Sequence, residues 1–383
     1  MKRINLVVLT REYPIEVAGT KRVQHLLEQL LIFETQIKVL SLRSKNNIEH
    51  EIGLYNGIQY ERISSTVSLT ILQLKKVFQY YCRTIKSLHN AKQKGIKNII
   101  YSYGVINIEN LIFILYAKII GYKLIIDIVE DYSTFSGKLK LISKFKIWTL
   151  RKLDRLNVLL SDAIVVISTH LQRKYDNMKA KNLTLIPITA KTSSNFKQKK
   201  EFNQPFLILY AGSFGDKDGV DLIIEGFIEF NKTFEASLLY LIGSSDQQKK
   251  YLDKYQGFQN IIFTGFIPDD EYFPLIQKAD VLCMCRTNSA YSNAGFPFKL
   301  GEYLATGNPI IATRVSDVEL FLSDDDAFLI ESDNRQQFIN AVLQIISDPI
   351  EAFRRGNNGL QICKTKFSPR INGEMLYKLL LKI

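Results

Sequence analysis

Two successive series of short apolar runs, separated by segments with helical spacing, constrain the fold of this chain most strongly. The first series of predicted strands is Ile4–Leu9, Ile37–Leu42, Ile58–Ile63, Asn98–Tyr103, Leu124–Val129 and Ala163–Ile167. The second series is Phe206–Ala211, Leu238–Ile242, Ile261–Phe263, Val281–Cys285, Pro309–Ala312 and Ala327–Ile330, and two helices are expected to close the chain. Strands that alternate with helices predict parallel sheets. The sequence therefore predicts an α/β protein with two Rossmann-like, doubly wound domains.

The domain boundaries follow from length and composition. At 383 residues the chain exceeds one average domain. Residues 189–204 are polar and rich in Lys and Ser, without an apolar period, which is typical of a linker. We expect an amino-terminal domain at 1–190, a linker at 191–204 and a carboxyl-terminal domain at 205–365. Residues 366–383 are expected to form a helix that returns to the amino-terminal domain.

The net charge of +12 indicates an anionic partner. A phosphorylated substrate, an anionic lipid surface and a nucleic acid all fit this charge, as does a basic surface that serves solubility alone. No nucleic-acid recognition motif accompanies it, so we expect no nucleic acid. The four cysteines lack metal-ligand spacing, and we expect reduced, mostly buried thiols, no metal and a cytoplasmic protein.

The sequence predicts a peripheral relation to a membrane. Ile4–Leu9 is too short for a signal peptide, and charged residues interrupt the apolar region Leu111–Val129. Lys138–Leu160 has the pattern of a basic amphipathic helix, with seven basic residues from Lys138 to Arg155 and one acid, Asp154. Such helices lie on anionic membranes, although this apolar face could equally pack on the sheet. The residues proposed for membrane or acceptor contact are Lys144, Lys146, Trp148 and Arg151.

Two positions in the first half are candidate sites because they follow predicted strands. Gly19 and Thr20 begin the helix after the first strand and can present N–H groups to a ligand, or simply form a turn. Glu130 and Asp131 follow the strand Leu124–Val129, at the carboxyl edge where ligands gather in open α/β sheets. A helix-capping role for this acid pair is the alternative.

The stretch Asn293–Thr313 has the pattern of a phosphate site. Gly295 and Pro297 precede a predicted helix, in which Pro297 suits the first turn. Lys299 stands at the positive end of the helix dipole, where an unpaired cation costs roughly 0.3–1 kcal/mol unless an anion joins it. Glu302 shares its face and suits ribose hydroxyls. The alternative is an ordinary helix start with one solvated lysine.

A second glycine-rich turn, Ala211–Gly219, also precedes a helix. Lys217 and the N–H groups of this turn can contact an anion from another side of the same site. The spacing of a P-loop is absent, so by itself the turn indicates no more than a surface loop.

Taken together, these two motifs resemble the carboxyl-terminal domain of GT-B glycosyltransferases of family four. Tyr210–Ser213 with Gly219–Phe227 is similar to the first donor-phosphate loop and helix of that family, and Gly295–Ala305 resembles its signature helix. Thr264–Ile267 matches the strand end near the nucleobase. The resemblance covers residues 205–350 well and 1–190 only as a pattern. It implies the GT-B fold, with two domains that face across a cleft.

The resemblance also implies roles for individual residues. Glu302 resembles the glutamate that holds the ribose, and Glu130 falls near the position of a histidine beside the reacting sugar. Lys299 and Lys217 would stabilise the leaving diphosphate, and Glu130 and Lys299 are the candidate catalytic residues. The candidate donor-binding residues are Gly19, Thr20, Ser213, Lys217, Phe266, Ile267, Gly295, Phe296, Pro297, Leu300 and Glu302.

Three positions depart from the family pattern. Ala294 stands where a first signature glutamate is usual, Ser213 where arginine is common, and Asp218 where a lysine usually precedes the glycine. These departures keep a second interpretation open, a catalytically degenerate GT-B protein that binds nucleotide or glycan as a partner subunit. A GT-B sugar-nucleotide epimerase is a further rival, but its acid and histidine set is missing.

The function predicted from these observations is retaining transfer from a nucleotide sugar, without a metal or another cofactor. The basic first half suits a lipid-diphosphate-linked glycan as acceptor. We therefore expect a glycosyltransferase of polysaccharide or glycolipid biosynthesis that acts at the cytoplasmic face of a membrane. The underlying hypothesis is that Ser213–Gly219 and Gly295–Glu302 converge on one anionic leaving group.

Overall fold

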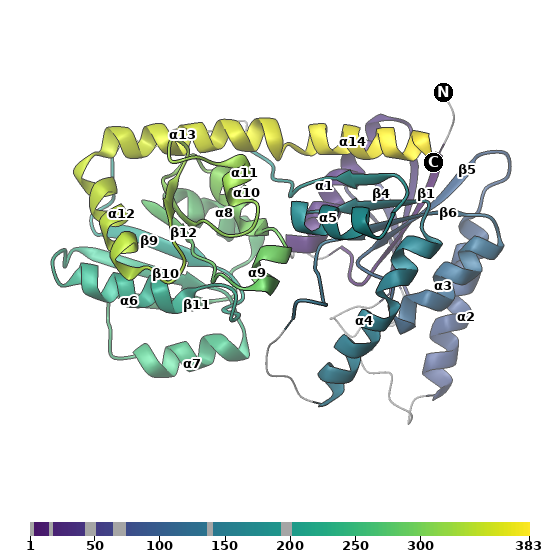
Figure 1. The fold of residues 1–383 in the computed structure, drawn as a ribbon, viewed down its shortest axis with the longest axis horizontal. Helices are drawn as coiled ribbons and strands as arrows, with labels where there is room; N and C mark the ends of the chain where they lie inside the picture. Colours follow the sequence, from purple (N-terminus) through teal and green to yellow (C-terminus); the bar gives the residue numbers. More distant parts are fainter. Residues whose placement is uncertain (1–3, 15–17, 43–50, 64–73, 136–140, 193–200) are drawn as a thin grey trace. The chain divides into compact units, whose positions relative to one another are not determined.

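The computed structural model describes residues 4–14, 18–42, 51–63, 74–135, 141–192 and 201–383 (Figure 1). The chain divides into two compact units. The first contains residues 1–189 and 369–383, and the second contains residues 190–368. Each unit has its own sheet and its own hydrophobic core.

The first unit is built on an eight-stranded sheet with the order β3-β4-β2-β1-β5-β6-β7-β8. All neighbouring strands are parallel except β3 and β4, which form an antiparallel hairpin at one edge. The strands are β1 (Ile4–Thr10), β2 (Gln36–Ser41), β3 (Glu51–Tyr55), β4 (Ile58–Arg62), β5 (Lys97–Tyr103), β6 (Lys123–Ile128), β7 (Ala163–Val166) and β8 (Leu183–Leu185). The central strands are apolar throughout because helices cover both faces.

Six helices belong to this unit, within the part that the structure describes. They are α1 (Ala18–Ile32), α2 (Leu74–Ala91), α3 (Ile108–Ile119), α4 (Leu141–Leu160), α5 (Thr169–Asn177) and α14 (Pro369–Lys382). Although α14 ends the chain, it lies along α1 (Figure 1). A Cβ added at Gly373 would lie 2.4 Å from the Cβ of Gln29, so this close approach of the two helices requires glycine.

A buried ion pair anchors α1 to the sheet. Arg22 and Asp127 pair at zero side-chain exposure, and Tyr101 also donates to this carboxylate. The guanidinium further donates to the carbonyl oxygens of Ile186, at 2.8 Å, and Pro187, at 3.2 Å. Burying two charges is costly unless they are paired and hydrogen-bonded. These bonds therefore fix the start of α1 against β6 and the chain after β8.

The second unit contains a six-stranded parallel sheet with the order β11-β10-β9-β12-β13-β14. Its strands are β9 (Phe206–Ala211), β10 (Ser237–Ile242), β11 (Ile261–Gly265), β12 (Val281–Met284), β13 (Ile310–Thr313) and β14 (Phe328–Ile330). Its helices are α6 (Val220–Asn231), α7 (Asp246–Tyr255), α8 (Asp269–Lys278), α9 (Ala290–Ala294), α10 (Phe298–Leu304), α11 (Val318–Phe321), α12 (Arg335–Ser347) and α13 (Pro349–Lys366). The predicted α/β fold with two doubly wound parallel sheets is confirmed.

Several details differ from the sequence-based expectations. Three helices, α12, α13 and α14, close the chain where two were expected, because Pro349 and Pro369 each begin a new one. The antiparallel strand β3 and the helix α9 were not predicted. Among the four free cysteines Cys82 is exposed, so the expectation of buried thiols holds only for the other three. Pro297 precedes α10 as its N-cap and does not occupy its first turn.

The end of the expected linker is packed in the second unit. Phe202 contacts the rings of Phe206 and Phe353, with centroids 5.1 and 5.0 Å away. Asn203 binds the Asp280 carboxylate through its N–H and its side-chain amide, at 3.0 and 2.9 Å. Residues 193–200 of the expected linker lie outside the described residues.

Candidate functional site

The two glycine-rich motifs lie at one place in the second unit. The sheet order reverses between β9 and β12, because β10 and β11 extend it to one side of β9 and β12 to β14 to the other. In open α/β sheets this switch point, at the carboxyl ends of the strands, is where ligands bind. Residues 212–219 follow β9, and residues 285–297 follow β12. Topology alone therefore brings both motifs to the expected ligand edge.

Asp218 organises the loop after β9. Its Oδ2 accepts hydrogen bonds from the Ser213 hydroxyl at 2.6 Å and from the Gly215 N–H at 2.9 Å. Gly219 then enters α6 with φ +57°, and a Cβ there would lie 2.2 Å from the carbonyl oxygen of Cys285. Glycine is therefore required both for the backbone conformation and for the contact with the neighbouring loop.

Further contacts join the two loops. The Thr287 N–H donates to the carbonyl oxygen of Lys217 at 3.2 Å, and the Lys217 ammonium lies 5.0 Å from the ring centroid of Tyr291. The Tyr303 hydroxyl, from α10, accepts the Ala211 N–H at 2.8 Å. The end of β9, the loop after β12 and the signature helix α10 thus form one packed assembly.

Lys299 and Glu302 form a three-residue polar group with Tyr272 of α8. The Lys299 ammonium lies 3.3 Å from Oε2 of Glu302 and donates to the Tyr272 hydroxyl at 3.1 Å. That hydroxyl donates to the same Oε2 at 3.0 Å, and the ammonium also lies 4.4 Å from the Tyr272 ring centroid. Burial and the nearby Glu302 carboxylate raise the pKa of Tyr272 well above its usual value, so the hydroxyl keeps its proton.

This arrangement changes the interpretation of Lys299. The sequence suggested a cation at the helix start whose charge only a bound anion would balance. In the structure Glu302 balances that charge, while about a third of the lysine side chain stays exposed. An anion that binds here must therefore compete with Glu302 for the ammonium.

The other predicted donor contacts differ in accessibility. Phe296 and Leu300 are 3% and 0% exposed, and Phe296 packs on the rings of Phe321 and Phe367. Their side chains therefore form core, which leaves backbone groups around Gly295 and Pro297 for a ligand. Phe266 differs, because it follows β11 and is 74% exposed. Ile267, next to it, is half-buried.

In the first unit, two predicted site residues converge on Tyr103 at the end of β5. A Cβ at Gly19 would lie 2.7 Å from the Tyr103 hydroxyl, so α1 starts against this ring. Burial raises the pKa of Tyr103, and the Glu130 carboxylate adds to this effect. Thr20 is buried and donates to the Glu12 carbonyl at 3.4 Å. Gly19 and Glu130 thus share one edge of the sheet.

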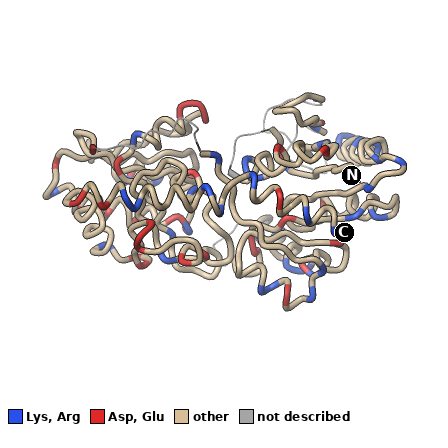
Figure 2. The backbone as a smooth tube through the Cα atoms, turned by 90° about the horizontal axis from the view of Figure 1, so that it is seen from above, with Lys and Arg blue, Asp and Glu red and all other residues tan. Residues whose placement is uncertain are grey.

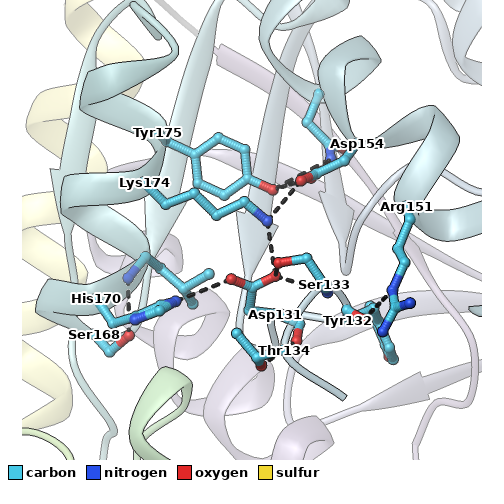
Figure 3. Close-up of polar contacts among 12 residues, drawn as sticks. Asp131, Tyr132, Ser133, Thr134, Arg151, Asp154, Ser168, His170, Lys174 and Tyr175 are labelled. Carbon is cyan, nitrogen blue, oxygen red and sulfur yellow. Dashed lines mark hydrogen bonds and ion pairs between the residues drawn. The ribbon is translucent and has the colours of Figure 1, made fainter. Parts of the chain in front are cut away.

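Asp131, next to Glu130, is the centre of a polar cluster (Figure 3). Its carboxylate is 2% exposed and accepts from His170 Nε2 at 2.9 Å, Lys174 Nζ at 2.7 Å and the Ser133 hydroxyl at 2.6 Å. Burial alone would raise its pKa, but the bonds from Lys174, Ser133 and His170 lower it to about 2. Lys174 also reaches Asp154 at 2.6 Å. Asp131 is therefore an ionised structural anchor between β6 and α5.

Two functional neighbours were missed from the sequence. Tyr272 gave no signal, since nothing in an acidic helix start indicates that its hydroxyl reaches a residue thirty positions away. His170 was dismissed as one of four scattered histidines, although it directly follows the predicted strand that ends at Ile167. Its place at the carboxyl edge, like that of Asp131, was the available signal.

The proposed membrane residues of α4 have unequal surroundings. Lys144, Lys146 and Trp148 are exposed, and the Trp148 ring stacks on Phe145 with centroids 5.9 Å apart. Arg151 donates to the carbonyl oxygens of Tyr132 and Phe135, at 3.2 and 2.7 Å, and so holds the loop after β6. The expectation that Phe145 and Trp148 belong to a packed apolar face is wrong, because they are 60% and 54% exposed.

Two absences concern the described residues only. None of their His, Cys, Asp and Glu side chains gather in groups of three or more that could hold a metal ion. Their helices also include none with the length and apolar character needed to cross a bilayer.

Comparison with known proteins supports the fold and the second-unit motifs. Residues 205–348 match the family Glycosyl transferases group 1. Sucrose-phosphate synthase from Thermosynechococcus elongatus is similar along the whole length, with 15% identity, a TM-score of 0.75, and 100% of this chain and 99% of that chain covered. HepE from Anabaena, solved in complex with UDP and glucose, has 14% identity and a TM-score of 0.71, with 99% and 100% covered.

A third similar structure is WaaG, a glycosyltransferase involved in lipopolysaccharide biosynthesis. It has 12% identity and a TM-score of 0.68, with 97% of this chain and 99% of that chain covered. No curated protein sequence matches. At these identities the likeness concerns the fold, and it confirms the predicted GT-B class with two Rossmann-like domains.

Proposed function

We propose, from the premise that residues 205–348 belong to the group 1 glycosyl transferases, that this chain is a retaining glycosyltransferase with a nucleotide-sugar donor. One observation carries the proposal: the loops after β9 and β12 meet at the switch point of the second sheet and bring Lys217, Lys299 and Glu302 to the same edge. A similar structure holds UDP and glucose, which supports a nucleoside diphosphate as the leaving group.

In the proposed reaction the bond between the sugar C1 and the diphosphate oxygen breaks, and the acceptor oxygen forms a new bond to C1 on the same face. The acceptor proton goes to the departing phosphate, so the step needs neither a protein base nor a metal. Lys217 and Lys299 stabilise the negative charge that develops on the diphosphate. Glu302 accepts hydrogen bonds from the ribose hydroxyls, and Glu130 orients the reacting sugar.

We further propose a lipid-diphosphate-linked glycan as acceptor and a site of action at the cytoplasmic face of an anionic membrane. The first unit supports this with an apolar stripe on the outer face of α3, where Ile108, Ile112, Leu115 and Ile119 are all exposed. The inner face of α3 is also apolar. A helix that is apolar on every side is ordinarily buried, so the stripe needs a cover.

Charge selects the cover of this α3 stripe. The neighbouring helices α2 and α4 carry exposed Lys and Arg side chains, which Figure 2 marks in blue along the backbone. Two copies of this face would repel one another, whereas an anionic bilayer offers both an apolar interior and opposite charge. Exposed Phe145 and Trp148 add apolar groups to the same set of helices.

The decisive test is donor binding and turnover by the full-length protein. Thermal-shift measurements with nucleoside diphosphates and their sugar conjugates should identify one that stabilises the protein by roughly 2.7 kcal/mol at one hundred times its dissociation constant. Glu302→Ala should lose this stabilisation, whereas Glu229→Ala, an exposed glutamate of α6, should retain it. No shift with any nucleotide would contradict the donor site.

A catalytically degenerate GT-B protein that acts as a partner subunit is the second candidate. Ser213 favours it, because its hydroxyl bonds to Asp218 and offers no positive charge to a phosphate. Such a protein would bind the nucleotide and lose binding in Glu302→Ala, but it would neither hydrolyse nor transfer the sugar. Release of nucleoside diphosphate from the donor, measured by chromatography, separates the two candidates.

A further inference from the structure

A cavity of about 330 Å³ lies at the carboxyl edge of the first sheet. Thr10 ends β1 and Ser102 lies near the end of β5, and both line it, while Phe145 and Lys146 of α4 form part of another wall. The strand order of this sheet reverses between β1 and β5, so the cavity occupies the switch point of the first unit. Its volume falls within the range of small-molecule sites.

Two buried hydroxyl groups face this cavity without a protein partner. Thr10 and Ser102 are 4% and 1% exposed, and within the described ranges neither side-chain hydroxyl has a hydrogen bond. An unsatisfied buried polar group costs roughly 1–3 kcal/mol. Native proteins satisfy nearly all such groups through protein, water or ligand. A hydroxylated ligand in the cavity would supply both missing bonds.

The charged residues around the cavity favour an anion. Arg11 and Lys146 both line it and are exposed, which places them toward its opening. The one acid in the lining, Glu109, accepts a hydrogen bond from the Tyr80 hydroxyl at 2.9 Å and is held toward α2. The exposed ring of Phe145 offers an apolar surface of the kind on which the face of a sugar ring packs. The lining thus combines hydroxyl partners, a ring and two cations.

We propose that this cavity binds a phosphorylated sugar, with the sugar hydroxyls on Thr10 and Ser102 and the phosphate between Arg11 and Lys146. The inference rests on the proposed function, in which this sugar is the group that receives the transferred residue. A free sugar phosphate and the glycosyl phosphate head of a lipid-linked glycan present the same chemistry to these residues.

The test is calorimetry on the full-length protein with the 1- and 6-phosphates of hexoses and N-acetylhexosamines. The same sugars without phosphate, and inorganic phosphate alone, are measured beside them. One phosphorylated sugar should bind at least ten-fold more tightly than either of its parts. Ser102→Ala should weaken this binding about five-fold, as expected for one lost hydrogen bond.

Matched variants separate this site from general effects. Ser161→Ala removes another buried serine hydroxyl that is outside the cavity lining, and it should leave the affinity unchanged. Lys146→Gln should weaken binding, whereas Lys152→Gln, an exposed lysine of the same helix outside the lining, should not. Failure of every sugar phosphate to bind, or equal affinity in all four variants, would overturn the proposal.

Further arms identify the source of the ligand and the independence of the result. Tighter binding of a dodecyl-linked glycosyl phosphate in phosphatidylcholine vesicles points to a lipid headgroup, and equal binding points to the free sugar phosphate; either supports the cavity. The nucleoside-diphosphate thermal shift in the same samples reports on the second unit. If that shift persists without sugar-phosphate binding, only the cavity assignment fails, and the reverse pattern removes only the donor assignment.

Discussion

Tyr272 is the residue whose role is most open to a direct test. Its hydroxyl donates to Glu302 and accepts from Lys299, so it fixes the distance between the two charged groups. Tyr272→Phe should weaken nucleoside-diphosphate binding about five-fold. It should also reduce the preference for uridine diphosphate over its 2′-deoxy analogue, because Glu302 would lose its orientation.

The control for this prediction is Tyr251→Phe, which removes a hydroxyl bonded to Asp221 at 2.8 Å on α7. It should leave both nucleotides equally well bound as in the unchanged protein. A Tyr272→Phe protein that is merely less stable would lose affinity for both nucleotides by the same factor. That result would assign Tyr272 a structural role only.

Asp131 makes a pH-dependent contribution to stability. Its pKa of about 2 in the folded protein lies below the usual aspartate value. Its carboxylate therefore stabilises the fold fully above about pH 4, and this contribution is lost as the pH falls toward 2. The difference of nearly two pKa units corresponds to about 2 kcal/mol.

Urea unfolding of Asp131→Asn and unchanged protein at pH 7, 5, 4 and 3 measures this contribution. The asparagine variant should be less stable at pH 7, and the gap should narrow from pH 4 to pH 3. Asp253→Asn, an exposed aspartate of α7, should show no such narrowing. A constant gap at all four pH values would show that the Asp131 pKa is ordinary.

At the residue scale, the sequence could predict where charged groups gather but not how they pair. Gly219 and Gly295 could be placed because glycine before a helix has a steric meaning. The link between Lys299 and Tyr272 depends on how α8 packs against α10, and no local pattern encodes it. The exposure of Phe145 was likewise invisible, because helical spacing gives an apolar face without saying what covers it.

At the element scale, the apolar stripe of α3 yields a prediction about membranes. Replacing Ile112 and Ile119 together by Gln should weaken binding to vesicles that contain anionic lipid about ten-fold. Each exposed isoleucine that enters the bilayer contributes roughly 1 kcal/mol, a fraction of the value for full burial. Vesicle cosedimentation at physiological salt measures the effect.

The matched change is Leu252→Gln with Ile262→Gln, two exposed apolar residues of the second unit. This pair should leave vesicle binding unaltered. Equal loss in both double variants would indicate that the α3 stripe has no special part in the contact. Retention of binding by both would leave electrostatic attraction alone as its cause.

Elements with strong periodicity were predictable, and short or antiparallel ones were not. The apolar runs that became β1, β9 and β12 stood out because a parallel strand is covered on both faces. The edge strand β3 alternates with exposed residues and has no comparable run. Helix α9 has five residues, too few for any helical period to appear in the sequence.

At the scale of the whole molecule, the last two helices serve different units although they are consecutive in the chain. α13 belongs to the second unit, while α14 places Leu376, Leu379 and Leu380 in the core of the first, beside Leu26 and Leu30 of α1. The first unit is therefore complete only after the whole chain has been made. Damage to α14 should weaken the first unit and spare the second.

Leu376→Ala tests this division, because Leu376 is fully buried and its truncation should cost roughly 2–5 kcal/mol. Hydrogen exchange should show faster exchange in α1 and β1 and unchanged exchange in α6 and α10. Leu381→Ala, at a 45% exposed position of the same helix, should change neither set. Equal loss of protection in α6 and in α1 would mean that the two units unfold as one, because the effect of α14 would then extend through the entire chain.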